Sequence, residues 1–168
     1  MKKFAAMLFL FVFGAVQGVH SEEKTYEIDP THTFPTFEAD HMGGLSLWRG
    51  KINRTSGKVI VDFETKTGSV DIVMDMSSID FGLVEMNDHA KSDDIFDVER
   101  FPSATYIGNL IFEGDEPVGV SGELNLHGVT KPVDLKVNRF KCMLHPLKLA
   151  WVCGADAETT IRRDDFGV

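Results

Sequence analysis

Basic residues are scarce in this chain relative to acidic ones. Its 168 residues include 17 Lys and Arg against 26 Asp and Glu, so the formal net charge is −9. The sequence contains no run of Lys or Arg and no basic helix pattern. Because a negatively charged surface is repelled by phosphate backbones and by anionic lipid headgroups, we do not expect the protein to bind nucleic acid.

Long apolar runs are also missing, apart from one at the start of the chain. Residues 4–16 are apolar and follow the basic residues Lys2 and Lys3. This stretch is shorter than the about 20 residues that a membrane-spanning helix needs, and the pattern is typical of a secretory signal peptide. We therefore predict a signal peptide over residues 1–21. Mature chains starting near Val19 and near Glu22 both fit, and the alternative is an apolar helix retained in the fold.

The rest of the chain is short enough for one domain. Removal of residues 1–21 leaves 147 of the 168 residues and, with the loss of two lysines, a net charge of −11. This length is typical of a single core, so residues 22–168 are predicted to form one domain.

Cysteine is rare, with only Cys142 and Cys153 present. The turn-like stretch His145-Pro146-Leu147-Lys148 lies midway between them, so a symmetric hairpin would place the two cysteines opposite each other. A cross-strand disulfide is then within reach, and export permits it. The alternative is two buried free thiols, because a register slip of one residue would turn one cysteine away.

Familiar catalytic and metal-binding motifs are absent. Ser121 is followed by Glu123 where a nucleophile elbow needs glycine, and Gly43-Gly44 lacks the Lys-Ser/Thr of a phosphate loop. Five of the six histidines lie after the predicted signal peptide, and they are too widely spaced for a zinc motif: they are His32, His41, His89, His127 and His145. We therefore predict no catalysis, no metal and no cofactor, while a metal-dependent enzyme built on the histidines stays as an alternative.

Alternation of apolar and polar residues dominates what remains. Residues 58–63 and 70–76, with a turn at 64–68, predict one β-hairpin, and residues 118–126 and 133–137, with a turn at 128–132, predict a second. Further strands are expected at residues 25–28, 34–40, 45–52, 104–112 and 149–161. The sequence thus predicts an all-β protein whose strands each have one apolar face.

One segment departs from this alternation. Residues 86–96 contain helix-compatible residues, with Asn87 or Asp88 as N-caps, and predict a short helix and loop that covers one end of the fold. Antiparallel strands with one apolar face form either a sandwich or a barrel, and large apolar side chains favour a barrel of about eight strands around a ligand. The pattern by itself leaves both architectures open.

Five segments in order resemble one known family. They are Tyr26-x-Ile28-Asp29-Pro30-x-His32-x-x-x-x-Phe37-x-x-x-His41; Gly57-x-Val59-x-Val61-Asp62; Phe96-Asp97-Val98-Glu99-Arg100-Phe101-Pro102-Ser103-Ala104; Gly122-x-Leu124-x-Leu126-His127-Gly128-Val129-Thr130-Lys131-Pro132-Val133; and Ile161-x-Arg163-x-Asp165-Phe166-Gly167. Together they resemble the YceI-like family of exported polyisoprenoid-binding proteins across nearly the whole mature chain. The resemblance implies an antiparallel lipocalin-like β-barrel in the periplasm that binds an isoprenoid quinone, a polyprenyl phosphate or a similar lipid without catalysis.

A site for such a ligand needs a deep apolar lining with few polar groups. The candidate lining residues are Phe34, Phe37, Trp48, Val61, Phe63, Ile72, Met74, Met76, Tyr106, Leu124, Leu126 and Trp151. For each of them singly, ordinary core packing is the competing interpretation. His32 and His41 are candidates for contacting a ligand headgroup or each other, with satisfied structural histidines as the alternative.

The resemblance also shows one departure. Relatives continue past the Phe-Gly motif into a further strand that closes the barrel, whereas this chain stops at Val168. We therefore expect the closing strand to be absent and one barrel edge to be unpaired, which favours pairing with another molecule, for example in a homodimer. The alternative to lipid binding is an envelope interaction module that docks to a partner protein.

Overall fold

Strands make up most of the molecule. The computed structural model describes residues 22–168, so the predicted signal peptide lies outside the described residues. The strands are β1 (Lys24–Glu27), β2 (Thr36–His41), β3 (Ser46–Ile52), β4 (Thr55–Asp62), β5 (Thr67–Asp75), β6 (Ile79–Asp80), β7 (Ser103–Glu113), β8 (Glu116–Leu126), β9 (Val129–Pro132), β10 (Leu135–Leu144) and β11 (Trp151–Glu158). The helices are α1 (Val84–Lys91) and the short 3-10 helices η1 (Met76–Ser78) and η2 (Arg163–Phe166).

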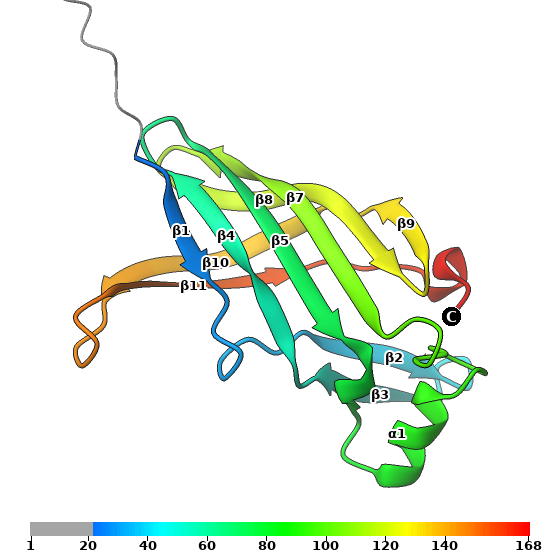
Figure 1. The fold of residues 1–168 in the computed structure, drawn as a ribbon. Coiled ribbons are helices and arrows are strands. Elements are labelled where there is room, and N and C mark those ends of the chain that lie inside the picture. Colours follow the sequence, from blue (N-terminus) through cyan, green and yellow to red (C-terminus); the bar gives the residue numbers. More distant parts are fainter. Residues whose placement is uncertain (1–21) are drawn as a thin grey trace, which may run out of the picture.

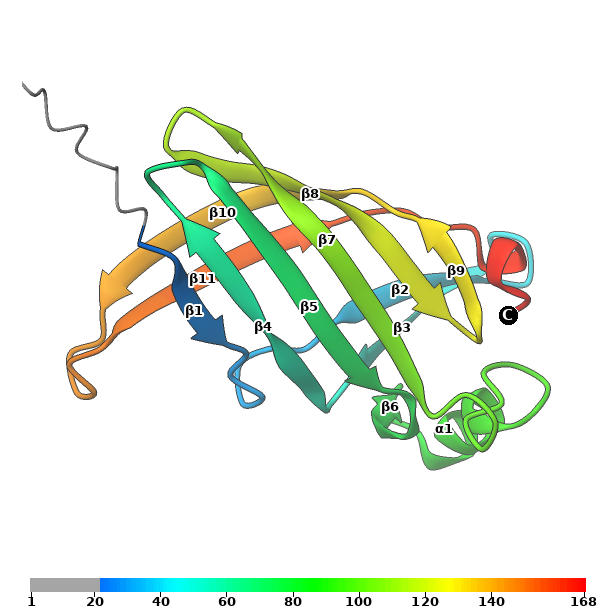
Figure 2. The ribbon, with the colours of Figure 1, turned by 45° about the horizontal axis from the view of Figure 1, so that its top comes forward.

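Two antiparallel sheets build the fold. The large sheet has eight strands in the order β1-β4-β5-β7-β8-β10-β11, with β9 pairing to β8, and the small sheet has the order β2-β3-β6. The large sheet curls so that β10 and β11 lie behind β4 and β5, and β2 and β3 lie near one end (Figure 1, Figure 2). The result is a nearly closed antiparallel barrel with one short helix, which confirms the predicted fold class.

The register of the large sheet places its apolar side chains on one face. Directly opposed residues of antiparallel strands project to the same side. Ile72 of β5 is opposite Tyr106 of β7, and Tyr106 is opposite Leu124 of β8. The buried core cluster collects on this side, and its members are Ile52, Val70, Met76, Ile79, Ala90, Ala104, Tyr106, Val120, Leu126, Val133 and Phe166.

The first predicted hairpin is present as β4 and β5. Its turn is held by Asp62, whose Oδ1 accepts hydrogen bonds from the backbone N–H groups of Glu64 (2.9 Å) and Thr65 (3.0 Å). The predicted second strand runs one residue too far, because β5 ends at Asp75 and Met76 belongs to η1. The Asp75 side chain accepts from the backbone N–H of Ser77 and so starts this 3-10 turn, which buries Met76 in the core instead.

The second predicted hairpin is wrong in its turn. Residues 129–132, assigned to the turn, form β9 and pair with β8, and the chain reverses at His127-Gly128. Both turn residues have positive φ, +52° and +76°, as a two-residue type I′ hairpin requires. Histidine tolerates this conformation better than most residues. Pro132 suggested a turn, but it is the last residue of the short strand β9, a position at which a strand tolerates proline.

The predicted helix is present but begins earlier than expected. Helix α1 starts at Val84, and its N-cap, Leu83, makes no side-chain capping bond, so the assignment of Asn87 or Asp88 as N-cap is wrong. Asn87 lies inside the helix and binds the preceding loop: its Oδ1 accepts from the N–H of Phe81 (2.6 Å) and its Nδ2 donates to Asp80 (3.0 Å). The helix lies at the end of the large sheet near β6 (Figure 2).

Tyr106 links three strands of the core. Its buried hydroxyl donates to the carbonyl of Val133 at 2.8 Å, just before β10 begins, and burial, with the negative charge of Asp134, raises the pKa of Tyr106 to about 12. A Cβ atom on Gly122 of β8 would lie 2.8 Å from this hydroxyl and 2.5 Å from the carbonyl oxygen of Ile107. Glycine at position 122 therefore makes room for the Tyr106 hydroxyl.

The two cysteines are bonded to each other. Cys142 of β10 is directly opposite Cys153 of β11, and their sulfur atoms are 2.02 Å apart. The symmetric hairpin that the sequence suggested is therefore present, with β10 ending at Leu144 and β11 beginning at Trp151.

Replacing both cysteines, Cys142→Ser with Cys153→Ser, is expected to lower the free energy of unfolding by about 3 kcal/mol, because the disulfide restricts the unfolded chain. Urea denaturation with and without reductant measures this loss. Reductant should destabilise the parent protein to the same extent and leave the double variant unchanged; equal midpoints for parent and variant would show that the hairpin does not need the bond.

Tyr106→Phe is expected to destabilise the fold by about 1 kcal/mol, since the buried carbonyl of Val133 loses its donor while the packing volume is kept. The matched control is Tyr26→Phe in β1, because the Tyr26 hydroxyl makes no hydrogen bond to any residue from 22 to 168 and so should be nearly silent. Denaturation midpoints of the two variants test the difference, and equal shifts would contradict this role for Tyr106.

Candidate functional site

The candidate site is the apolar side of the large sheet that faces the barrel interior, which we call the inner face. Its members are Val59, Val61, Val70, Ile72, Met74, Tyr106, Leu110, Val120, Leu124, Leu126 and Leu135. The register brings them together from β4, β5, β7, β8 and β10. Six of the predicted lining residues belong to it, namely Val61, Ile72, Met74, Tyr106, Leu124 and Leu126.

The inner face is only partly covered by other residues. Val70, Tyr106 and Val120 are buried, but Ile72 and Leu124 are only half-buried. The same is true of Val59, Met74, Leu110 and Leu135. Since these side chains project from the inner side of the sheet, their accessible surface lies along the barrel interior. The sheet thus presents a band of apolar surface that a ligand can reach.

Aromatic residues bound this band near the turn between β4 and β5. The ring of Phe63 lies 6.4 Å from that of Phe112 and 6.3 Å from that of Phe140, measured between centroids. Phe140 belongs to β10, which is separated from β4 by three strands in the sheet order, so this contact crosses the barrel. The predicted lining residue Phe63 therefore lies where the two walls of the barrel meet.

A second aromatic group lies on the small sheet. Phe37 packs edge-on against Phe81 at 5.3 Å between centroids, and Trp48 lies 6.2 Å from the same ring. Phe37 and Phe81 also pack against the buried core. The predicted residues Phe37 and Trp48 thus lie together on β2 and β3, which belong to the small sheet.

Three predicted lining residues lie elsewhere. Met76 is buried in η1, and Phe34 precedes β2, exposed, with the Lys51 ammonium 5.3 Å from its ring centroid. Trp151 is 63% exposed at the start of β11. Beyond Lys136, β10 pairs with β11 alone in the described sheet, so no neighbouring strand covers this tryptophan.

The two candidate headgroup contacts are not brought together. His32 lies in the turn before β2, where its Nδ1 is 3.0 Å from Asp29 Oδ2. His41 is the last residue of β2; its Nδ1 is 3.1 Å from the Ser46 hydroxyl, and its ring lies tilted against that of Trp48 at 4.8 Å between centroids. Each histidine therefore has its own nearby partners, His32 before β2 and His41 at the end of β2.

Hydrogen bonds lower the pKa of the Asp29 carboxyl group beside His32. The hydroxyl and the backbone N–H of Thr31 both donate to Asp29, and together with His32 they lower the pKa of Asp29 to about 2. The Asp29 carboxylate is therefore ionised at neutral pH and closes the turn as an acceptor. This is a structural role for the Asp-Pro-x-His segment of the sequence motif.

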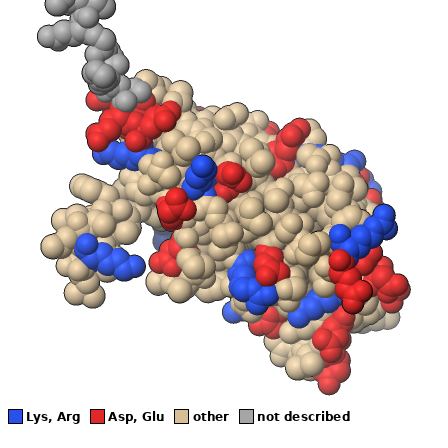
Figure 3. All heavy atoms as spheres, in the orientation of Figure 1, with Lys and Arg blue, Asp and Glu red and all other residues tan. Residues whose placement is uncertain are grey.

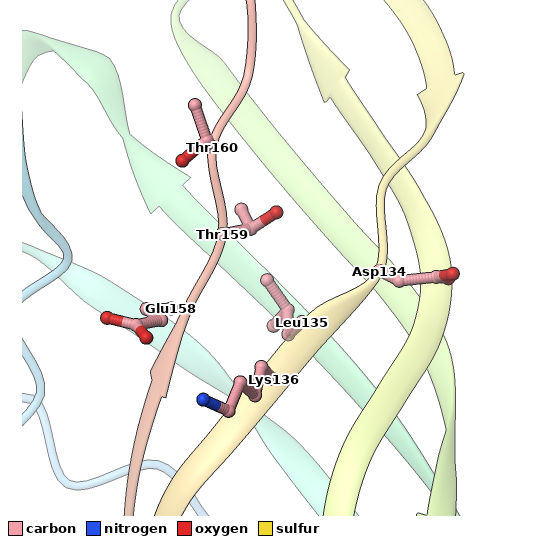
Figure 4. Close-up of a pocket in the computed structure, with 6 residues that line it drawn as sticks. All are labelled: Asp134, Leu135, Lys136, Glu158, Thr159 and Thr160. Carbon is pink, nitrogen blue, oxygen red and sulfur yellow. The ribbon is translucent and has the colours of Figure 1, made fainter.

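Two open hollows lie beside the inner face. The larger, about 410 Å³, lies where β10 and β11 separate and is lined by Asp134, Leu135, Lys136, Glu158, Thr159 and Thr160 (Figure 4). The other, about 270 Å³, lies between β3 and the start of α1, lined by Leu47, Trp48, Arg49, Phe81, Leu83 and Met86. Neither is a continuous apolar channel, since Leu135 is the one apolar residue that lines the first and the second lies outside the large sheet.

Within residues 22–168, no three or more His, Cys, Asp or Glu side chains gather in a way that would hold a metal ion. The helices of this part are also too short or too polar for any of them to cross a membrane.

Phe140 is a functional candidate that sequence reasoning missed. The register between β10 and β11 shifts between Val137 and Arg139, which marks a bulge. Strict alternation from Leu135 would turn Phe140 outward, but the extra residue returns it to the interior, where it meets Phe63. The alternation of apolar and polar residues does not reveal a bulge, so this contact is seen only once the pairing of β10 with β11 is known.

Solved structures that are similar to this chain share its fold. BcnA of Burkholderia cenocepacia has a TM-score of 0.59 at 21% identity, with 87% of this chain and 81% of BcnA covered. A YceI protein of Campylobacter jejuni has a TM-score of 0.61 at 20% identity, with 84% and 82% covered. At these identities the likeness concerns the fold alone.

Sequence comparison gives the same family. A UPF0312 protein of Vibrio campbellii is 30% identical over 121 residues, which are 71% of this chain and 64% of that protein. One of Vibrio vulnificus is 34% identical over 114 residues, covering 66% and 60%. The chain thus spans less than two thirds of the length of these relatives. The model of the YceI-like domain matches residues 26–168, and the chain therefore belongs to the YceI-like domain family.

Proposed function

We propose that this protein is an exported carrier that binds a long apolar ligand, a polyisoprenoid or a similar lipid, along the inner face of its barrel. The observation that carries the proposal is the band of half-buried aliphatic side chains, such as Ile72 and Leu124, that the register places on the barrel interior. An isoprenoid chain offers little except apolar surface, and this band is complementary to it.

The apolar surface that a bound lipid would bury is large enough to account for stable binding. Each Å² of apolar surface removed from water contributes about 25 cal/mol, so a ligand that covers a few hundred Å² gains several kcal/mol before association costs. The aromatic contact between Phe63 and Phe140 closes one end of the band. The Tyr106 hydroxyl, which lies within the band, donates to the carbonyl of Val133 and is therefore engaged by the protein itself.

The proposed location is the periplasm. Two features support it: the predicted signal peptide over residues 1–21 and the disulfide between Cys142 and Cys153, which persists in oxidising compartments. Native mass spectrometry of the exported protein also reports any bound partner protein or second copy of the chain.

Protein purified from its native envelope is expected to carry an isoprenoid lipid that organic extraction and mass spectrometry identify. Native mass spectrometry of the same sample gives the mass of the bound lipid and the number of subunits. Repeated preparations that are intact and free of lipid would contradict the carrier function.

Leu124→Gln is expected to weaken binding of a long-chain isoprenoid quinone or polyprenyl phosphate about tenfold, because it places an amide in the apolar band. The matched control is Ile107→Gln, since Ile107 is exposed on the outer side of the paired strand β7. Equilibrium binding to the purified variants, with circular dichroism to confirm folding, measures the effect. Equal affinity in both variants would place the ligand elsewhere.

A further inference from the structure

The charge of this acidic protein is unevenly distributed. Residues 135–155, which cover β10, its turn and most of β11, contain no Asp or Glu, although the chain has 26 of them. The same segment contains Lys136, Arg139, Lys141 and Lys148. The overall charge predicts repulsion from anionic surfaces, but this hairpin is locally cationic.

The end of this hairpin is also the most exposed apolar part of the described chain. We call residues 143–151 the hairpin tip. Within it Leu147 is 88% exposed, Leu149 78% and Trp151 63%. Scattered exposed leucines are ordinary, but adjacent large apolar side chains on a protruding element indicate an interaction site.

The tip projects away from the barrel. β10 pairs with β8 only at Leu135 and Lys136, so the rest of the hairpin extends beyond the neighbouring strand. Figures 1 and 2 show its turn separated from the other loops. In Figure 3, drawn in the orientation of Figure 1, this protruding part is tan and blue and shows no red.

The hairpin tip is held in shape rather than left free to fold back. The Cys142–Cys153 disulfide joins the two strands next to it. Within the turn, the N–H of His145 donates to the carbonyl of Ala150 (2.8 Å), and the N–H of Leu149 donates to that of His145 (3.0 Å). The His145 Nδ1 accepts from the N–H of Lys148 at 3.1 Å. These bonds keep the apolar side chains presented to the outside.

We propose that the hairpin tip docks this protein to an anionic lipid bilayer, with Leu147, Leu149 and Trp151 entering the interface. Lys141 and Lys148 then lie at the level of the headgroups, where long basic side chains extend toward phosphate while their stems cover apolar surface. Tryptophan is favoured at this depth because its ring is apolar and its N–H is polar.

A bilayer fits these features better than a second copy of this chain. An anionic bilayer offers negative charge at its surface and apolar chains directly beneath, and the hairpin offers both complementary kinds of group, with Lys141 just before the tip and Lys148 between Leu147 and Leu149. The proposal rests on the proposed function, because it identifies the bilayer as the place where the carrier takes up or releases its lipid.

Vesicle flotation tests the docking. The probe is vesicles of phosphatidylethanolamine with phosphatidylglycerol, compared with vesicles of phosphatidylcholine alone, and both are free of isoprenoid. The protein is the exported full chain, with its N-terminus read by intact mass. We expect binding to the anionic vesicles that falls at least tenfold in Leu147→Ser with Leu149→Ser. The matched control is Leu45→Ser, because Leu45 is 73% exposed in the turn between β2 and β3 and should leave binding unchanged.

Fluorescence reports the depth of the tip. The chain has two tryptophans, so in Trp48→Phe all tryptophan emission comes from Trp151. Anionic vesicles should shift its emission to shorter wavelength, and Lys141→Glu with Lys148→Glu should remove both the shift and the flotation.

Three results would overturn the docking: no flotation of the parent protein, equal loss in the Leu45→Ser control, or a concentration-dependent dimer that the tip variants abolish while vesicles go unbound. Extraction of lipid from the tip variant separates the two proposals. Retained isoprenoid with lost flotation supports docking by the tip, and retained isoprenoid in a parent protein that never floats overturns docking while leaving the carrier function intact.

Discussion

The antiparallel register of the large sheet is the constraint on which the other features depend. It sets Ile72, Tyr106 and Leu124 side by side, and it places Gly122 where the Tyr106 hydroxyl needs room. A slip of one residue would turn each apolar set outward and separate these partners. The core and the accessible apolar band are therefore consequences of the same pairing, because both are drawn from one face of the same strands.

The bulge in β10 adds a second constraint. By shifting the register between Val137 and Arg139, it turns Phe140 into the interior, where it meets Phe63 across the barrel. On the turn side of this shift the register is regular, so Cys142 lies opposite Cys153 and the disulfide forms at the base of the projecting hairpin tip. The β10–β11 hairpin therefore contains both a bulge that turns Phe140 into the barrel and a disulfide that joins its strands beside the tip.

These two regions suit the two steps of the proposed carrier function. The inner face offers apolar surface inside an acidic molecule, and the hairpin tip offers apolar surface outside it, beside the basic residues Lys141 and Lys148. A lipid carrier has to bind its ligand away from water and also meet the membrane that supplies it. The net negative charge by itself would predict repulsion from an anionic membrane. The hairpin avoids this repulsion because residues 135–155 contain basic residues and no acidic ones.

Local chemistry allowed much of this protein to be predicted from its sequence. Alternation predicted most strands and the face of Ile72 and Leu124, and the spacing of the cysteines about Pro146 predicted their pairing, because side chains alternate with period two in any strand. Tertiary structure alone decided that the chain reverses at His127-Gly128, that Asn87 binds a loop instead of capping α1, and that a bulge redirects Phe140. The reversal and the Asn87 hydrogen bonds are local, but they depend on backbone conformation and side-chain bonding that alternation does not encode. The Phe63–Phe140 contact joins segments that are distant in sequence, which a pattern along one strand does not contain.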